Sequence, residues 1–210
     1  MNDEIIKELE DAKDKVEIDR QEAVKESTKE LDDIVEEMFL GTHPPRLEIF
    51  YCLPTAMISR PQTKGSACFD IHACLQKSGH IDAFDQHNQL QLVPVINESL
   101  EIHPKWRYLI PTGCIFNIPE GYSVRIHPRS GLAIKFGLTL INCEGVIDSD
   151  YVEQVMITLV NFSEETTVIQ HTERLCQGEL VEQLVYSMSN TLRKPEQKTD
   201  RVGGFGSTGK

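Results

Sequence analysis

The sequence predicts an all-β protein, built as an antiparallel barrel or sandwich and preceded by a helical extension. From residue 46 onward, short runs of β-branched and aromatic residues alternate with Gly- and Pro-rich turns, which is typical of many short antiparallel strands. Residues 3–39 differ sharply, because they contain neither Gly nor Pro and are rich in Glu, Lys and Asp. We find no internal repeat.

Residues 1–40 are expected to form an acidic helical extension. Their apolar residues recur at intervals of three and four, which is the period of a helix face. Gly41 suits a helix C-cap, and Pro44 and Pro45 prevent the helix from continuing. A helix that packs on its own domain or on a neighbouring subunit is favoured over an autonomous coiled coil, because the apolar stripe is thin and interrupted.

The β-rich part, residues 46–192, contains the clearest local signals. Residues 108–128 predict three strands separated by turns at 111–113 and 119–121. Residues 130–137 are expected to form a helical turn, and residues 161–165 a hairpin loop. Residues 76–103 are polar and less patterned, so we expect an insertion with the form of an elaborated hairpin.

Composition limits the classes of function. The chain has 210 residues, of which 40% are hydrophobic and 26% charged, and no apolar run reaches the roughly 18 residues that span a bilayer. No signal-peptide pattern is visible, and the six cysteines include no Cys-x-x-Cys pair. We therefore expect reduced thiols, a cytoplasmic location and no membrane association.

The charge is unevenly distributed. Residues 1–40 hold 6 Lys and Arg against 15 Asp and Glu, a net of −9 out of −12 for the whole chain. Duplex nucleic acid is a poor partner for such a chain, because its binding depends on many basic side chains. A small phosphorylated ligand needs only a few local cations, so the acidic net charge does not exclude such a ligand.

Three stretches suggest phosphate chemistry. In "HPRSGLA" (127–133), Arg129 and Ser130 offer donors, and Gly131 lets backbone amides approach a ligand. In "NCEGVIDSDY" (142–151), the carboxylate of Asp148 or Asp150 could accept a proton from an attacking water. Each stretch alone also fits an ordinary turn.

The third stretch is the tail, "RVGGFGSTGK" (201–210), which contains the spelling of a phosphate-binding P-loop. A P-loop opens a helix and continues with a Ser or Thr that binds magnesium, whereas this sequence stops at Lys210. We therefore interpret residues 193–210 as a glycine-rich arm, which is either merely flexible or closes over a ligand.

Five motifs in order resemble those of the trimeric all-β dUTPase family. They are "ACFDIHA" (67–73), "PRSGLA" (128–133), "NCEGVIDSDYVEQVMITLVN" (142–161), "RLCQGEL" (174–180) and "RVGGFGSTG" (201–209). The resemblance covers residues 46–75 and 104–209, and it implies an antiparallel jelly-roll-like barrel. It also implies hydrolysis of dUTP to dUMP and pyrophosphate, which lowers dUTP and supplies dUMP for thymidylate synthesis.

The resemblance also implies roles for individual residues. Asp148 corresponds to the catalytic carboxylate that activates water for attack on the α-phosphorus, and Asp70 to the aspartate that contacts the Mg²⁺ through water. The implied phosphate-binding residues are Arg129, Ser130, Gly131, Gln177, Arg201, Ser207, Thr208 and Gly209. The implied base- and sugar-binding residues, including the hairpin of residues 142–151, are Asn142, Gly145, Val146, Ile147, Tyr151 and Phe205. A homotrimer with active sites shared between subunits is implied as well.

Some positions depart from the family pattern. Cys68 stands where the family commonly has Gly, and Val152, Glu153 and Gln154 replace a common Arg-Gly-Glu. A zinc site at His72 with Cys68 and Cys74 is disfavoured, because strand alternation explains that spacing.

Two alternatives stay open. One is a triphosphatase for a C5-modified deoxyuridine nucleotide, and the other is a trimer of this fold with an additional partner-binding role for the helix and the insertion. A dCTP deaminase on the same fold is disfavoured, because it is not expected to retain the "GGFGSTG" tail.

Overall fold

The computed structural model describes residues 44–75 and 79–199. These ranges include four of the five motifs, at residues 67–73, 128–133, 142–161 and 174–180. The expected helix of residues 1–40 and the expected active-site residues Arg201, Phe205, Ser207, Thr208 and Gly209 lie outside the described residues.

The described elements are short strands and one short helix, as the sequence predicts. The strands are β1 (Glu48–Tyr51), β2 (Ile58–Ser59), β3 (Phe69–His72), β4 (His80–Phe84), β5 (Leu90–Pro94), β6 (Ser99–Ile102), β7 (Arg107–Pro111), β8 (Cys114–Asn117), β9 (Tyr122–Pro128), β10 (Leu138–Leu140), β11 (Gly145–Asp148), β12 (Met156–Asn161), β13 (Thr167–Gln170) and β14 (Arg174–Glu182). The helix, α2, spans Ser130–Phe136 and follows β9 directly.

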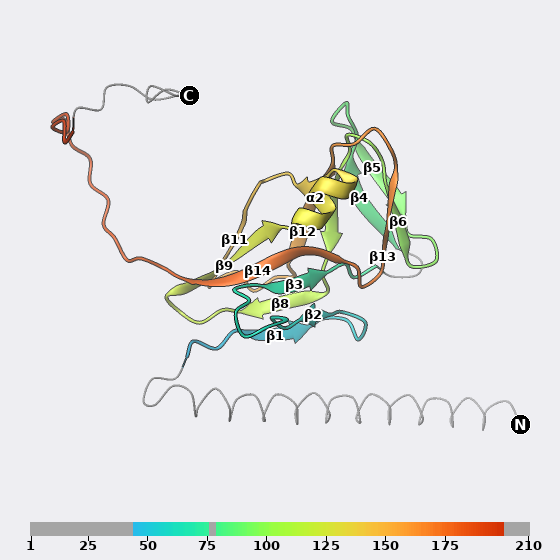
Figure 1. Cartoon of the computed structure of the whole chain (residues 1–210), viewed down its shortest axis with the longest axis horizontal. Coiled ribbons are helices and arrows are strands. Elements are labelled where there is room, and N and C mark those ends of the chain that lie inside the picture. Colours follow the sequence, from blue (N-terminus) through green and yellow to red (C-terminus); the bar gives the residue numbers. More distant parts are fainter. Residues whose placement is uncertain (1–43, 76–78, 200–210) are drawn as a thin grey trace, which may run out of the picture.

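The strands form two five-stranded sheets, and every strand pairing between the described elements is antiparallel (Figure 1). We call the sheet with order β11-β9-β14-β3-β2 the site sheet; the other has the order β10-β12-β7-β4-β5. Two short ladders, β1–β8 and β13–β6, complete the architecture. Because most neighbours in each sheet are not consecutive in sequence, the arrangement is jelly-roll-like, and the predicted all-β fold class is confirmed for the described residues.

One apolar core lies between the sheets. Alternate residues of the site sheet, such as Ile71, Val124 and Ile126, pack in the same buried cluster as Ile110 and Leu159 of the other sheet. Burial raises the pKa of the thiol of Cys114 to about 12, so this core cysteine stays protonated and behaves as a small apolar side chain. The six cysteines are all free thiols, as expected.

The local turn signals are confirmed. Strands β7, β8 and β9 follow one another with turns at the predicted positions, and Gly113 and Gly121 both adopt positive φ, at 69° and 83°. At Gly113 a Cβ would also lie 2.6 Å from the Cβ of Ala56, so both conformation and space require glycine. The hairpin expected within residues 76–103 is present as β4 and β5, and β4 also pairs with β7 in the sheet that faces the site sheet across the core.

Two expected hairpins are wrong. The loop at residues 161–165 joins two different sheets, because β12 pairs with β10 and β7 whereas β13 pairs with β6. Asn161 redirects the chain there: its amide donates to the carbonyls of Ile102 and Glu165 at 2.9 and 2.8 Å. Within residues 142–151, a single strand, β11, forms, and it pairs with β9 rather than with a strand inside that segment.

We expect the substitution Asn161→Ala to destabilise the protein by about 2–4 kcal/mol, because it removes the side-chain amide that donates to the buried carbonyl of Ile102. The side chain is fully buried, and its Oδ1 also accepts hydrogen bonds from the backbone N–H and hydroxyl of Ser163. Thermal unfolding should show a midpoint lowered by roughly 4–16 °C. Asn117→Ala, at an exposed strand position, is the matched control and should leave the midpoint almost unchanged; equal effects of the two substitutions would contradict the role of Asn161.

Candidate active site

A buried carboxylate surrounded by cationic and amide donors lies on the site sheet. Asp70 on β3 is only 4% exposed. Its Oδ1 lies 3.4 Å from Nε of Arg129 and accepts a hydrogen bond from Nε2 of Gln177 at 3.2 Å. Its Oδ2 lies 3.2 Å from Nη1 of Arg174. We call Asp70, Arg129, Arg174 and Gln177 the phosphate cluster; it contains two guanidinium groups and one carboxyl group.

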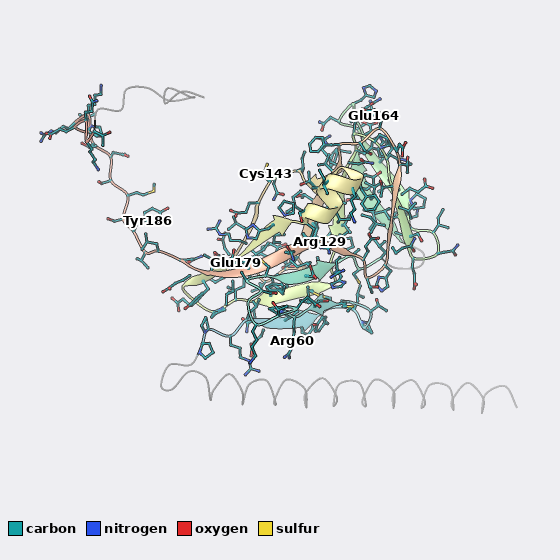
Figure 2. The ribbon with its side chains drawn as sticks, in the orientation of Figure 1. Arg60, Arg129, Cys143, Glu164, Glu179 and Tyr186 are labelled. Atoms are coloured by element: carbon teal, nitrogen blue, oxygen red, sulfur yellow. The ribbon has the colours of Figure 1, made fainter. Side chains whose placement is uncertain are left out.

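Strand register brings these residues together. Asp70 is paired directly with Gln177 across β3 and β14, so their side chains lie on the same face of the site sheet. A register shift between Arg174 and Cys176 brings Arg174 alongside, and Arg129 follows the last residue of β9. Figure 2 shows Arg129 in the middle of the molecule, between α2 and the site sheet.

The predicted donors Ser130 and Gly131 lie next to this cluster, at the start of α2. Arg129 is held by a hydrogen bond from its Nη1 to the carbonyl of Arg174 at 2.9 Å. A Cβ at Gly131 would meet no atom within 4 Å, so nothing within the described chain requires glycine there. Close approach of a ligand to this backbone is a physical reason for glycine at this position.

The cysteine beneath the cluster is not a nucleophile. Burial raises the pKa of Cys176, although the nearby Arg129 acts in the opposite direction. The thiol therefore stays protonated at neutral pH, which argues against a covalent mechanism through it.

Sequence reasoning did not assign Arg174 a role, although it opens the motif "RLCQGEL". Its guanidinium is half-exposed and contacts one carboxylate oxygen of Asp70, while Arg129 contacts the other. The sequence signal was a basic residue at the start of this motif, but only the strand register shows which carboxylate it contacts.

The other predicted residues that the structure describes gather at β11, the edge strand of the site sheet, or next to it. Asp148 ends β11 and is exposed, as are Val146 and Tyr151, whereas Ile147 is partly buried. Oδ1 of Asn142 accepts a hydrogen bond from the hydroxyl of Thr158 at 2.9 Å, and the hydroxyl of Tyr151 donates to the carbonyl of Gln154 at 3.1 Å. The structure therefore separates these residues from the phosphate cluster.

The length of strand β9 gives the distance between Asp148 and the phosphate cluster. Asp148 is paired with Ser123 near the start of β9, whereas Arg129 lies just beyond its end. Six residues of extended strand span about 20 Å, and Asp70 is additionally three strands away from β11. General base catalysis requires hydrogen-bond reach of about 3 Å, or one intervening water, so Asp148 cannot serve a ligand held by the phosphate cluster of the same chain.

The comparison with known proteins now decides the family. A sequence profile described as dUTPase matches residues 95–209, which is more than half of the chain. The deoxyuridine 5'-triphosphate nucleotidohydrolase of Wolinella succinogenes is 36% identical over 157 residues, covering 75% of this chain and 89% of its own. The chain belongs to the dUTPase family.

Solved structures support the fold of this dUTPase-family chain. A point variant of the dUTPase of Staphylococcus bacteriophage 80alpha with dUpNHpp superposes with a TM-score of 0.60 at 19% identity, covering 78% of this chain and 98% of that one. A dUTPase variant from phage phi11 of Staphylococcus aureus, described with a structural Mg(II) ion, gives 0.54 at 18% identity, over 70% and 97%. Among the described residues, no helix is long and apolar enough to cross a membrane.

We expect Arg174→Gln to lower kcat/KM for dUTP by about tenfold or more, because the cluster loses a cation and a charge-assisted hydrogen bond to Asp70. Arg174→Lys should recover part of the loss, because it restores the charge. Steady-state kinetics of both variants check this, with the exposed Arg60→Gln as the matched control. Kinetics of Arg174→Gln equal to those of the control would rule out the positioning role.

Proposed function

We propose that this chain hydrolyses dUTP to dUMP and pyrophosphate in active sites that two or more copies of the chain build together. One observation carries the proposal: the cationic phosphate cluster and the carboxylate of Asp148 lie at opposite ends of β9 in one chain. Hydrolysis needs both groups within a few ångströms of the same phosphorus, so each site takes them from different chains.

The phosphate cluster is proposed to hold the triphosphate. Five groups offer donors to phosphate oxygens: the guanidinium of Arg129, the hydroxyl of Ser130, the backbone amide of Gly131, the side-chain amide of Gln177 and the N–H groups of Arg174 that do not contact Asp70. Donors fixed by strand pairing stabilise the negative charge that develops during in-line attack without rearranging at that moment.

Asp148 of a neighbouring copy is proposed as the general base. Its exposure at the end of β11 leaves the carboxylate free to accept a proton from the attacking water. The water then attacks the α-phosphorus, and pyrophosphate leaves in line with it.

The base and sugar are proposed to lie along β11. Because β11 is an edge strand among the described residues, its backbone groups facing away from β9 have no strand partner in this part of the chain and can pair with the edge of uracil. Gly145, Val146 and Ile147 supply this backbone, and Asn142 and Tyr151 flank it. A base that mismatches these backbone groups would leave polar atoms buried and unpaired, which can discriminate on the order of 10⁴-fold.

Mg²⁺ is proposed as the cofactor. Both oxygens of Asp70 already meet donors, so this carboxylate fits contact with metal-bound water better than direct coordination. When bound, the ion would neutralise phosphate charge and polarise the phosphoryl group.

The assembly is proposed to be a homotrimer, with residues 193–210 closing a site of a neighbouring copy. After Glu182 the chain leaves the sheets as an extended segment, and Tyr186 lies well away from them (Figure 2). The segment exposes the large apolar side chains of Leu184, Val185, Tyr186, Met188 and Leu192. Such a surface is expected to be covered by another copy. The free thiols support a reducing, cytoplasmic setting.

We expect the intact chain with Mg²⁺ to prefer dUTP over dCTP, dTTP and UTP, and Asp148→Asn to lower turnover of dUTP by about 10²–10⁴-fold. Pyrophosphate release measured for each nucleotide checks both statements. Preference for a C5-substituted deoxyuridine triphosphate would favour the alternative substrate. Full activity of the Asp148→Asn variant would show that Asp148 is not the general base.

Mixing two inactive variants should restore activity if sites are shared. Asp148→Asn keeps an intact phosphate cluster, whereas Arg129→Ala keeps an intact base. In trimers assembled at random from equal amounts, about one quarter of the sites receive both intact groups, so turnover should recover to about one quarter of the original. Trimers of each variant refolded alone are the controls; no recovery in well-folded mixed trimers would show that sharing is wrong.

A further inference from the structure

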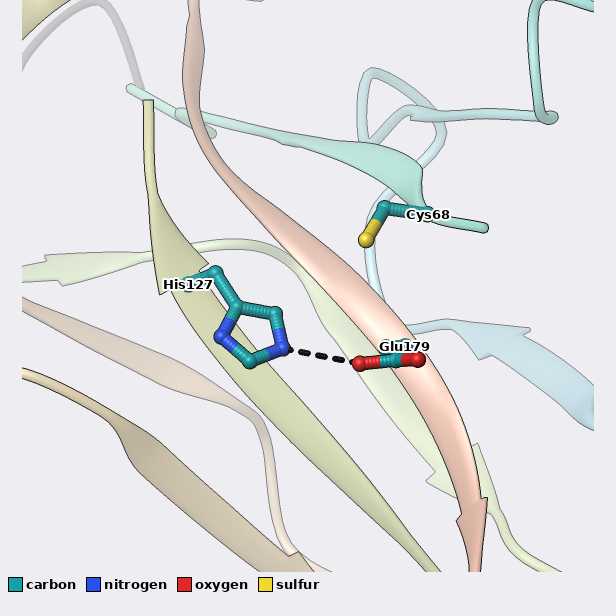
Figure 3. Close-up of side chains that lie close together, drawn as sticks. All are labelled: Cys68, His127 and Glu179. Carbon is teal, nitrogen blue, oxygen red and sulfur yellow. Dashed lines mark hydrogen bonds and ion pairs between the residues drawn. The ribbon is translucent and has the colours of Figure 1, made fainter. Parts of the chain in front are cut away.

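Three side chains with metal-ligating atoms converge on the site sheet outside the phosphate cluster. The thiol of Cys68, the imidazole of His127 and the carboxylate of Glu179 have ligand atoms that all lie within 4.8 Å of one another (Figure 3). Nε2 of His127 lies 3.1 Å from Oε2 of Glu179. We call these residues the three-ligand cluster; each of them is partly buried.

Strand pairing fixes the positions of these residues. His127 is on β9 and Glu179 is on the adjacent strand β14, while Cys68 immediately precedes β3, the next strand of the sheet. His127 is paired with Gln177, and Glu179 lies two residues further along the same face of β14. Two ligands are therefore carried by paired strands and the third by the residue directly before a strand, which favours a defined geometry.

The second nitrogen of His127 also has a suitable partner. Its Nδ1 lies 3.7 Å from Oε1 of Glu144, while Nε2 faces Glu179. Glu144 is itself held by Nη1 of Arg125 at 3.5 Å. A carboxylate on the far nitrogen of a ligating histidine fixes the tautomer and orients the ring, and this arrangement is common around protein-bound metals.

We propose that Cys68, His127 and Glu179 bind a transition-metal dication of the Zn²⁺ class, with Glu144 orienting His127. This site is separate from the Mg²⁺ of the proposed hydrolysis, and it does not depend on that function being correct. It differs also from the disfavoured combination of Cys68 with His72 and Cys74. His72 instead bonds to the hydroxyl of Ser59 and the carbonyl of Thr172.

The donor set selects the class of metal. Thiolate and imidazole suit Zn²⁺ and its neighbours, whereas Mg²⁺ requires oxygen ligands in near-octahedral geometry. Tetrahedral bonds to zinc place ligand atoms about 3.4–3.7 Å apart. The ligand atoms of the cluster lie within 4.8 Å of one another, so a modest rotation of the side chains would bring them to that distance. Three protein ligands leave a fourth position for water or another small ligand.

The local charge also favours a cation. The carboxylate of Glu179 lies within the cluster and that of Glu144 lies beside it, and a bound dication compensates for their negative charge. The metal would then tie β3, β9 and β14 together at mid-sheet, beside the phosphate cluster.

The test uses the full chain after removal of metals with a chelator. Titration with Co²⁺ should give one ion per chain and a near-ultraviolet thiolate-to-cobalt charge-transfer band, and Zn²⁺ should abolish that band by displacement. Excess Mg²⁺ should leave the band unchanged. At about a hundredfold excess over Kd, Zn²⁺ should also raise the thermal midpoint by about 5–10 °C.

Matched variants assign the site. Cys68→Ser should abolish the charge-transfer band and Glu179→Gln should weaken binding by about 100-fold, while Glu144→Gln should weaken it by about 10-fold. Cys143→Ser removes an exposed thiol elsewhere and should behave like the original chain. Circular dichroism and the mass of the assembly verify folding, and Glu179→Gln carries the test if Cys68→Ser does not fold. Absence of stoichiometric binding, a band retained in Cys68→Ser, or equal loss in Cys143→Ser would each overturn the proposal.

Discussion

The antiparallel pairing of β9 with β11 on one side and β14 on the other is the constraint that sets the functional geometry. A strand cannot be shortened without breaking its ladder, so the two ends of β9 stay about 20 Å apart. Asp148 is tied to one end, and Arg129 follows the other. Under the proposed function, each chain therefore supplies parts of two different sites, and assembly of copies is a condition of the chemistry.

The buried carboxylate of Asp70 fixes the positions of the charged side chains around it. A carboxylate that is almost fully buried is stable only when it is paired, and here two guanidinium groups and an amide supply the partners. In the proposed function, the same guanidinium groups bind the triphosphate. Asp70 would then hold these donors in position before the ligand arrives, and the excess positive charge of the cluster would remain available to the ligand.

The parts of the structure that depend on neighbouring residues could be predicted from sequence. Gly113 and Gly121 marked their turns, because positive φ is a local requirement. The helix at Ser130–Phe136 lies within the predicted range of residues 130–137, and Gly137 ends it in the left-handed conformation. The loop after Asn161 could not be predicted, because the partner of its amide, the carbonyl of Ile102, is 59 residues away.

Site residues divide in the same way. The motifs identified Asp70, Arg129 and Gln177, and the structure brings these three together. The contact of Arg174 with Asp70 spans 104 residues and passes through a register shift, which no local pattern encodes. The three-ligand cluster was missed for the same reason: Cys68, His127 and Glu179 become neighbours only when β3, β14 and β9 are placed in register.

The site sheet thereby carries two sets of polar side chains with different chemistry on one face. In the phosphate cluster the cations exceed the carboxylates, so it suits an anionic ligand that brings its own hard metal ion. In the three-ligand cluster a thiol and an imidazole meet a carboxylate, so it suits a softer cation. Because Cys68 and Asp70 are only two residues apart and lie on one face of the site sheet, charge placed in one cluster acts on the other over a short distance.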